Sequence, residues 1–287
     1  MPSIDVNGVS LYYERAGSGE PVVFSHGIPT DYRAWGAQVE AFSKSYSTLA
    51  YSRRYAAPNK REGDVTDSTV EANAADLKGL IEKLGIGPVH LVGHSYGGFV
   101  AAYLAADHPE LVRTLILVEP AIATLLIEDP NSSGQMFSLL LGNPGVALSA
   151  RRFQSGSLGP SLKALDSGQP KKAVQLNVDG IQNKVGAFAE LPAPAQEMMV
   201  DNAKTIAELR TRLPPFKASA VKIARSTLVI NGANSAVWLK RIGELAARAI
   251  PHAQALTISG SRHFPHLENP SEFNSSALKF IASARRA

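Results

Sequence analysis

Apolar residues along the chain follow two alternating patterns. Short apolar runs of about four to eight residues are typical of buried strands, and apolar residues that recur every three or four positions are typical of helices that bury one face. The runs predict strands at residues 9–15, 21–25, 47–52, 89–92, 112–118, 226–230 and 255–259, and the helical periods predict helices at 35–43, 68–85, 97–108, 237–249 and from about Ser271 onward. Residues 1–15 alternate around Asn7-Gly8, which predicts a hairpin. Strands that alternate with helices indicate βαβ units, an α/β fold and a mostly parallel sheet.

This rhythm is interrupted in the middle of the chain. Residues 121–222 contain no strand-like run, and instead carry helical patches separated by turn-forming residues such as Asn143-Pro144-Gly145 and Pro214-Pro215. We therefore predict an α/β core formed by residues 1–120 and 223–287, with a helical cap inserted at 121–222.

Composition and charge exclude several classes of protein. Hydrophobic residues make up 45% of the 287, which is enough for a large core. The net charge is +4, and the lysines and arginines are scattered in ones and twos rather than gathered in a stripe, so we expect no nucleic-acid partner. The absence of cysteine excludes a disulfide scaffold, a thiolate metal site and a cysteine nucleophile.

The hydropathy pattern also bears on location. No stretch approaches the roughly 18 uninterrupted apolar residues that cross a bilayer, and residues 1–5 lack the basic stretch and apolar run of a signal peptide. We expect a cytoplasmic protein without a membrane partner. The pattern sets no oligomeric state.

The most specific motif is Gly93-His94-Ser95-Tyr96-Gly97, between the strand at 89–92 and the helix at 97–108. A G-x-S-x-G sequence by itself can be a simple turn. Between a strand and a helix, however, its small residues allow a sharp turn that projects the serine, and the helix points backbone N–H groups at it. This context favours Ser95 as a nucleophile.

A serine nucleophile needs a base, and His263 is the best-placed histidine. It follows the strand at 255–259 and the turn Gly260-Ser261, and loops at the carboxyl ends of parallel strands are where such sheets gather their active-site groups. His266 is the alternative, although we expect it to pack against or cap the following helix. The remaining histidines have simpler interpretations: His26 stabilises its own loop, His94 points away from the nucleophile, and His90, His108 and His252 lie at the surface or at helix edges.

Three motifs together resemble the α/β-hydrolase superfamily: His26-Gly27-Ile28-Pro29, the elbow around Ser95, and His263-Phe264-Pro265-His266-Leu267-Glu268-Asn269-Pro270. They have the order and spacing of that family, and the likeness covers residues 4–281, loosely over 121–222. The resemblance implies a Ser-acid-His triad, an oxyanion hole formed by the N–H groups of Ile28 and Tyr96, and no metal or organic cofactor. Epoxide hydrolases and haloalkane dehalogenases share the His-Gly-x-Pro loop but carry Asp at the elbow, so Ser95 argues against both.

The chain departs from the family at the triad acid. Most relatives carry an Asp after the strand represented here by 226–230, but the matching turn, Gly232-Ala233-Asn234-Ser235, has a serine in its place. Glu119, at the end of the strand 112–118, is our candidate replacement, because some relatives, including zearalenone-lactone hydrolases, resemble this arrangement. A carboxylate that ends an apolar strand is otherwise unfavourable to bury. Asp129 and Glu268 are the alternatives, and for Glu268 we expect a place near the N-terminus of the last helix.

Two further segments bear on the substrate. Relatives often have a glycine-rich turn where residues 51–58 carry Arg53 and Arg54, which either shape the pocket mouth, bind a substrate carboxylate, or pair with surface acids. The 121–222 segment resembles the cap that covers the site in many relatives, and part of its apolar content would line an apolar acyl pocket while most of it forms core. The residues concerned are Leu125, Leu126, Met136, Phe137, Leu139, Leu140, Phe153, Phe188, Met198 and Met199.

Together these features predict a hydrolase that cleaves a carboxylic ester or lactone of a small apolar substrate through a Ser95 acyl-enzyme. The same fold and triad also serve C–C bond hydrolases, hydroxynitrile lyases, perhydrolases and cofactor-free dioxygenases. A catalytically weak ligand-binding homologue is a further alternative, and an inactive hydrolase is expected if Glu119 points away from the site.

Overall fold

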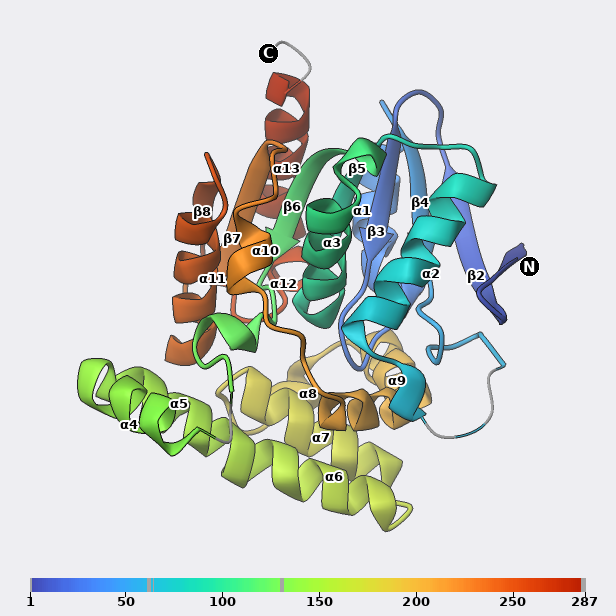
Figure 1. The fold of residues 1–287 in the computed structure, drawn as a ribbon. Helices are drawn as coiled ribbons and strands as arrows, with labels where there is room; N and C mark the ends of the chain where they lie inside the picture. Colours follow the sequence, from blue (N-terminus) through green and yellow to red (C-terminus); the bar gives the residue numbers. More distant parts are fainter. Residues whose placement is uncertain (1, 61–62, 64, 130–131, 285–287) are drawn as a thin grey trace.

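The computed structural model describes residues 2–60, 63, 65–129 and 132–284, and its centre is one eight-stranded sheet (Figure 1). The strands are β1 (Ser3–Val6), β2 (Val9–Ala16), β3 (Pro21–Ser25), β4 (Ser47–Tyr51), β5 (Val89–His94), β6 (Val112–Val118), β7 (Thr227–Gly232) and β8 (Gln254–Ile258). Their order is β1-β2-β4-β3-β5-β6-β7-β8. The pairs β1–β2 and β2–β4 are antiparallel, and every other neighbouring pair is parallel. Asn7 and Gly8 turn the β1–β2 hairpin with φ of 48° and 75°, the left-handed values that a type I′ turn requires.

Helices cover both faces of this sheet (Figure 1). They are α1 (Gly36–Phe42), α2 (Val70–Lys83), α3 (Ser95–Asp107), α11 (Val237–Ala249), α12 (Pro265–Glu268) and α13 (Pro270–Ala284). Successive residues of a strand point to opposite faces, so Leu91 of β5 joins the apolar core under α2, α3 and α11, while Val92 joins the core under α1 and α13. Because both faces are buried, the central strands are almost continuously apolar, which is the pattern that predicted them.

The described part of residues 121–222 carries helices and turns and no strand, as the sequence predicts. Its α-helices are α4 (Ser133–Gly142), α5 (Pro144–Phe153), α6 (Gly159–Asp166), α7 (Pro170–Ile181), α8 (Ala187–Glu190), α9 (Ala193–Asp201) and α10 (Lys217–Ala220). Most of them lie across the edge of the sheet where the parallel strands end (Figure 1). The division into a core and a cap remains a prediction. Among the described helices, none is both long enough and apolar enough to cross a bilayer.

His90 corrects one expectation from the sequence. We predicted it at the surface or a helix edge, but β5 buries it completely, and its Nδ1 lies 2.8 Å from the hydroxyl of Thr114 on β6. Helices cover both faces of this strand, so a polar side chain there needs a polar partner on the neighbouring strand. His108 is half-buried and His252 is exposed, in line with the prediction.

Candidate active site

The sharp turn between β5 and α3 presents Ser95. Ser95 has a φ of 52°, a left-handed conformation that is unfavourable by roughly 1–2 kcal/mol for a residue with a Cβ. The turn is tight because its glycines let strand and helix touch: a Cβ on Gly93 would lie 2.5 Å from the carbonyl oxygen of Gly97. The strained turn holds the Ser95 side chain at the carboxyl edge of the sheet, where the residue is 7% exposed.

The structure brings Ser95, His263 and Glu119 together at this edge. Nε2 of His263 lies 3.0 Å from Ser95 Oγ, and its Nδ1 lies 3.3 Å from Glu119 Oε2. Glu119 directly follows β6 with a φ of 46°, so two residues of this group adopt left-handed backbone. Strain of this kind persists where the surrounding structure enforces it and is common at functional sites. His263 and Glu119 are buried, which isolates the hydrogen-bonded chain from bulk water.

The second oxygen of Glu119 explains how a buried carboxylate is tolerated. Oε1 accepts hydrogen bonds from the Gly232 N–H at 2.7 Å, the Ser235 hydroxyl at 2.7 Å and the Asn231 amide at 3.1 Å. Hydrogen bonds to an ionised acceptor are strong, and they compensate for the loss of water. Ser235, at the position where the family resemblance leads us to expect an Asp, therefore donates to the Glu119 carboxylate.

The His26-Gly27-Ile28-Pro29 loop packs directly on the elbow. A Cβ on Gly97 would lie 2.3 Å from the His26 carbonyl oxygen, and a Cβ on Gly27 would lie 2.9 Å from the Ser95 Cβ. These approaches bring the peptide that contains the Ile28 N–H beside the serine. Tyr96 is the second residue of α3, where N–H groups have no acceptor within the helix. The location of both groups suits the predicted oxyanion hole, and that role remains a prediction.

His26 stabilises its own loop, as we predicted. Its Nε2 accepts the Arg53 N–H at 2.9 Å, so its Nδ1 carries the proton and donates to the Gly27 carbonyl at 2.8 Å. Burial, with a contribution from the Arg53 charge, lowers the pKa of His26 well below its ordinary value. The ring is therefore neutral, and the loop keeps this tautomer.

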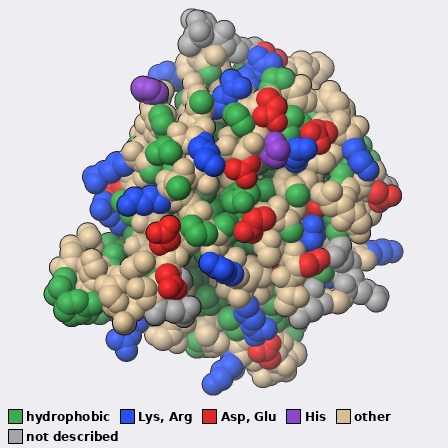
Figure 2. Space-filling model, viewed as in Figure 1, with side chains coloured by type: hydrophobic (Ala, Val, Ile, Leu, Met, Phe, Trp, Pro, Cys, Tyr) green, Lys and Arg blue, Asp and Glu red, His purple; other side chains and the backbone are tan. Residues whose placement is uncertain are grey.

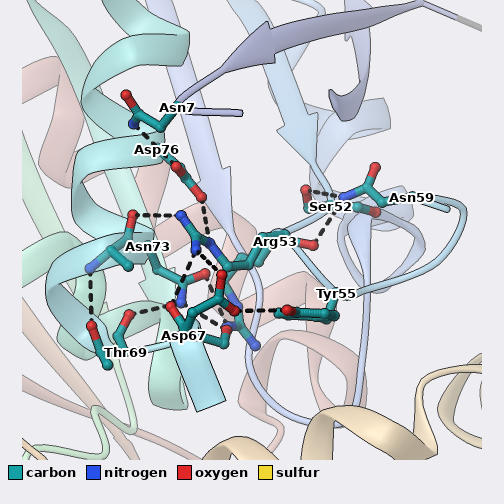
Figure 3. Close-up of polar contacts among 12 residues, drawn as sticks. Asn7, Ser52, Arg53, Tyr55, Asn59, Asp67, Thr69, Asn73 and Asp76 are labelled. Carbon is teal, nitrogen blue, oxygen red and sulfur yellow. Dashed lines mark hydrogen bonds and ion pairs between the residues drawn. The ribbon is translucent and has the colours of Figure 1, made fainter. Parts of the chain in front are cut away.

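Arg53 and Arg54 pair with acids of the chain itself. Arg53 is 1% exposed and forms a 2.7 Å ion pair with Glu208, which lies in a 3₁₀ helix (Ala203–Arg210) of the 121–222 segment. Arg54 contacts Asp76 at 2.8 Å and Asp67 at 3.1 Å. Figure 3 shows the surrounding contacts of Arg53, Asn73, Asp67 and Asp76. Pairing with acids was one of our alternatives, but Glu208 and Asp76 are buried rather than at the surface.

Arg53 also contacts both segments that carry the predicted oxyanion-hole N–H groups. Its Nε donates to the His26 carbonyl at 3.1 Å, and its guanidinium carbon lies 4.8 Å from the centre of the Tyr96 ring. A cation over an aromatic face is attracted by the ring quadrupole. Sequence reasoning missed Glu208, because 155 residues separate it from Arg53 and no local pattern links them.

The alternatives for base and acid lie outside the hydrogen-bonded chain of Ser95, His263 and Glu119. His266 stacks on Trp35 with ring centres 4.5 Å apart, and burial followed by the nearby His263 lowers its pKa to about 3. Glu268 accepts backbone N–H groups of the loop that carries His263. It ends α12 just before the last helix, α13, but its carboxylate faces that loop. Asp129 is exposed.

Among the apolar residues proposed for an acyl pocket, Leu125, Leu126 and Leu139 are half-buried against the core, and the others fall into two groups. Phe153, Phe188, Met198 and Met199 are buried in the core, where Phe153 stacks on Trp238. Met136, Phe137 and Leu140 of α4 are 41%, 61% and 45% exposed, so they do not line an enclosed pocket in this structure. Figure 2 shows apolar side chains gathered over this end of α4 and α5, with charges of both signs interspersed over the rest of that face. Among the described residues, no cluster of three or more histidines and acids forms a metal site.

Comparison with known proteins identifies the family. Residues 20–270 match the α/β hydrolase fold family. A Mycobacterium tuberculosis protein named as a non-heme bromoperoxidase, BpoC, is 30% identical over 287 residues that cover 96% of this chain and 99% of that protein. Among solved structures, an esterase from Exiguobacterium antarcticum has a TM-score of 0.77 at 18% identity over 98% of both chains. The enol-lactonase of Burkholderia xenovorans has a TM-score of 0.65 at 22% identity, covering 98% of this chain and 100% of that one. The chain belongs to the α/β-hydrolase family.

Proposed function

We propose that this protein is a serine hydrolase that cleaves a carboxylic ester or lactone of a small apolar substrate through a Ser95 acyl-enzyme. The observation that carries the proposal is the continuous hydrogen-bonded chain from Ser95 Oγ to His263 Nε2, 3.0 Å, and from His263 Nδ1 to Glu119 Oε2, 3.3 Å. A nucleophile within reach of a base, and a base oriented by a third group, is the arrangement that activates a serine.

In this mechanism His263 accepts the Ser95 proton while Oγ attacks the substrate carbonyl. Glu119 holds the histidine tautomer and stabilises the imidazolium as it forms. The negative oxygen of the tetrahedral intermediate faces the N–H groups of Ile28 and Tyr96, and loss of one such donor typically lowers turnover by ~10²–10³. His263 then returns its proton to the leaving alcohol. A water molecule, deprotonated by His263, attacks the acyl-enzyme and releases the acid.

The substrate class rests on the site itself. Ile28, Ile122 and Phe264, which lie close in sequence to the reacting residues, are apolar and buried, and such surroundings suit an apolar acyl or alkyl group. Two structural relatives are named as an esterase and an enol-lactonase, but at 18% and 22% identity their likeness shows the fold alone. The direct test is therefore chemical.

Turnover of p-nitrophenyl acetate and butyrate, together with labelling by a fluorophosphonate, tests this function. We expect release of nitrophenol and one covalent adduct, located on Ser95 by peptide mass spectrometry. The Ser95→Ala variant is the control and should show neither. A folded wild-type protein that neither turns over the esters nor reacts with the fluorophosphonate would rule out the serine hydrolase.

The likeness to BpoC, at 30% identity over nearly the whole chain, favours a second candidate, perhydrolysis. Here hydrogen peroxide replaces water as the acceptor of the acyl group, and the product is a peracid that oxidises bromide. Bromination of monochlorodimedone that requires both peroxide and a carboxylic acid or ester, and that Ser95→Ala abolishes, would support it. Ester hydrolysis without such bromination would exclude it.

A further inference from the structure

Two side chains hold the backbone of the loop that carries His263 (residues 260–264, the His263 loop). Three successive backbone N–H groups are each accepted by a side chain. Oε2 of Glu268 accepts those of Arg262, at 2.7 Å, and Phe264, at 3.2 Å, and Oε1 of Gln182 accepts that of His263 itself, at 2.8 Å. The Gln182 amide also donates to Glu268 Oε1 at 3.2 Å, so the two side chains form one linked clamp.

The two halves of the clamp come from different parts of the chain. Glu268 is at the end of α12 and close to the loop in sequence. Gln182 follows the last residue of α7, in the 121–222 segment, and 81 residues separate it from His263. It is 3% exposed, so water does not replace it as an acceptor. Without its side chain, a buried N–H of His263 would be left unpaired, which is unfavourable because no water replaces the lost acceptor.

We propose that Gln182 is a positioning residue for His263. Because Gln182 belongs to the 121–222 segment, the geometry of the base then depends on how this segment packs on the core. The inference rests on the proposed function, since it treats His263 as the base. Ser95 is only 7% exposed with the segment in this place. The contact between Gln182 and the His263 N–H sets the peptide from which the imidazole projects, so the position of the segment on the core and the alignment of the base occur together.

Asn202 offers a matched control within the same segment. It is completely buried, its amide donates to Asp31 at 2.7 Å, and its carbonyl oxygen accepts the Ala57 N–H at 2.7 Å. It thus also joins the segment to the core through two hydrogen bonds, but neither reaches the His263 loop. Asn202→Ala removes a comparable attachment without touching the clamp.

The first experiment compares kcat and KM for p-nitrophenyl butyrate. Gln182→Ala should lower kcat by about tenfold to a hundredfold, the effect of a misaligned catalytic group, with little change in KM. Asn202→Ala should lower the urea midpoint while its kcat stays within about threefold of wild type, because the aligned groups are untouched. Wild-type kcat in a folded Gln182→Ala variant, or an equal loss in Asn202→Ala, would overturn the proposal.

Gln182→Glu supplies a readout that a merely structural contact would not move. Protonated, the new carboxyl accepts the His263 N–H and donates to Glu268, as the amide does. Ionised, it loses its donor and repels Glu268, and that repulsion together with burial raises its pKa. The kcat of Gln182→Glu relative to wild type should therefore fall as pH rises, and a ratio that is flat between pH 5 and pH 9 would contradict the proposal. This variant also serves if Gln182→Ala does not fold.

Proton NMR separates a failure of this inference from a failure of the proposed function. The Nδ1–H of His263, bonded to Glu119, should give a downfield resonance in the wild-type protein and in Asn202→Ala, and a broadened or shifted one in Gln182→Ala. That measurement needs no turnover. If the wild type neither hydrolyses esters nor labels at Ser95, the proposed function falls while the resonance still decides whether Gln182 positions the imidazole; an unchanged resonance in Gln182→Ala refutes it.

Discussion

Glu119 follows the last residue of β6, and Ser235 lies in the turn after β7, the next strand of the sheet. The register pairs Val118 with Ile230, so the ends of the two strands lie side by side. A carboxylate at the end of β6 can therefore reach His263, as one in the turn after β7 would. Ser235 also contributes to the site, because its hydroxyl donates to the Glu119 carboxylate.

Glu119→Gln tests the acid at the scale of one atom. Three donors surround Oε1, so the variant's amide oxygen should occupy that place and turn its NH₂ toward Nδ1 of His263, which favours the wrong tautomer. We expect kcat to fall by ~10³–10⁴, as in the corresponding change of the serine protease triad. Glu268→Gln, which keeps an acceptor for the loop, should lower kcat by less than about tenfold. The reverse order would identify Glu268 as the acid.

Ser235→Asp in the Glu119→Gln background tests whether the two positions are interchangeable. The new carboxylate would stand where most relatives carry it, beside a residue that already reaches the site. We expect it to recover at least about tenfold in kcat by restoring a negative partner for the imidazolium. Ser235→Ala in the same background is the control and should recover nothing, and equal activity of the two double variants would argue against interchange.

The buried His266 should lower the free energy of unfolding in acid. Its pKa is about 3 in the folded protein against an ordinary value of 6.5, so the unfolded chain binds the proton more readily. Between pH 6.5 and pH 3 this one residue should remove about 1.4 kcal/mol of unfolding free energy for each unit that the pH falls. His266→Phe keeps a ring to stack on Trp35 and should reduce the slope by that amount. Urea unfolding at pH 7, 5.5 and 4.5 measures the slope, and parallel curves would contradict the shift.

Hydrophobic periodicity predicted most strands of the sheet and most helices that cover it. The strand expected at 89–92 extends to His94 and the helix begins at Ser95 rather than Gly97, because the elbow itself completes both elements. Ser95 could be located from its motif between a strand and a helix, and His263 and Glu119 from their places at the carboxyl ends of parallel strands, with the family resemblance also supporting Glu119. Gln182 and Glu208 could not, since their contacts span 81 and 155 residues and leave no periodic trace.

The contact between α3 and the loop after β3 predicts the effect of Gly97→Ala. The new Cβ would lie 2.3 Å from the His26 carbonyl oxygen and 2.4 Å from that of Ser25, and neither backbone atom can rotate away. We expect a loss of about 1–3 kcal/mol in unfolding free energy, the usual result of overpacking, and a lower kcat because the loop that carries Ile28 is pushed off the elbow. Gly145→Ala in α5, where nothing lies within 4 Å of the new Cβ, should leave both unchanged or slightly raise stability. Equal stability of the two variants would refute the steric argument.

Buried polar contacts join the 121–222 segment to the core near the site. Gln182 reaches the His263 loop, Asn202 reaches Asp31, and Glu208 reaches Arg53, which in turn contacts His26 and Tyr96. Apolar packing tolerates many arrangements of similar volume, whereas each of these contacts is satisfied in one geometry. These contacts therefore fix the position of the segment relative to both the proposed base and the predicted oxyanion hole.

The Arg53–Glu208 pair carries the last prediction. Both side chains are almost fully buried, so Arg53→Met leaves a buried carboxylate without its cation, a loss of about 3–5 kcal/mol in unfolding free energy. The double variant Arg53→Met/Glu208→Leu removes both charges and should be more stable than Arg53→Met alone. Burial already raises the pKa of Glu208, with Arg53 opposing that effect. Without Arg53 the folded-state pKa rises further above the unfolded value, so Arg53→Met should lose stability relative to wild type as pH rises from 5 to 8, and the double variant should not. Urea unfolding of the three proteins at both pH values measures this, and a double variant no more stable than Arg53→Met, with losses that do not depend on pH, would mean that the two charges do not depend on each other.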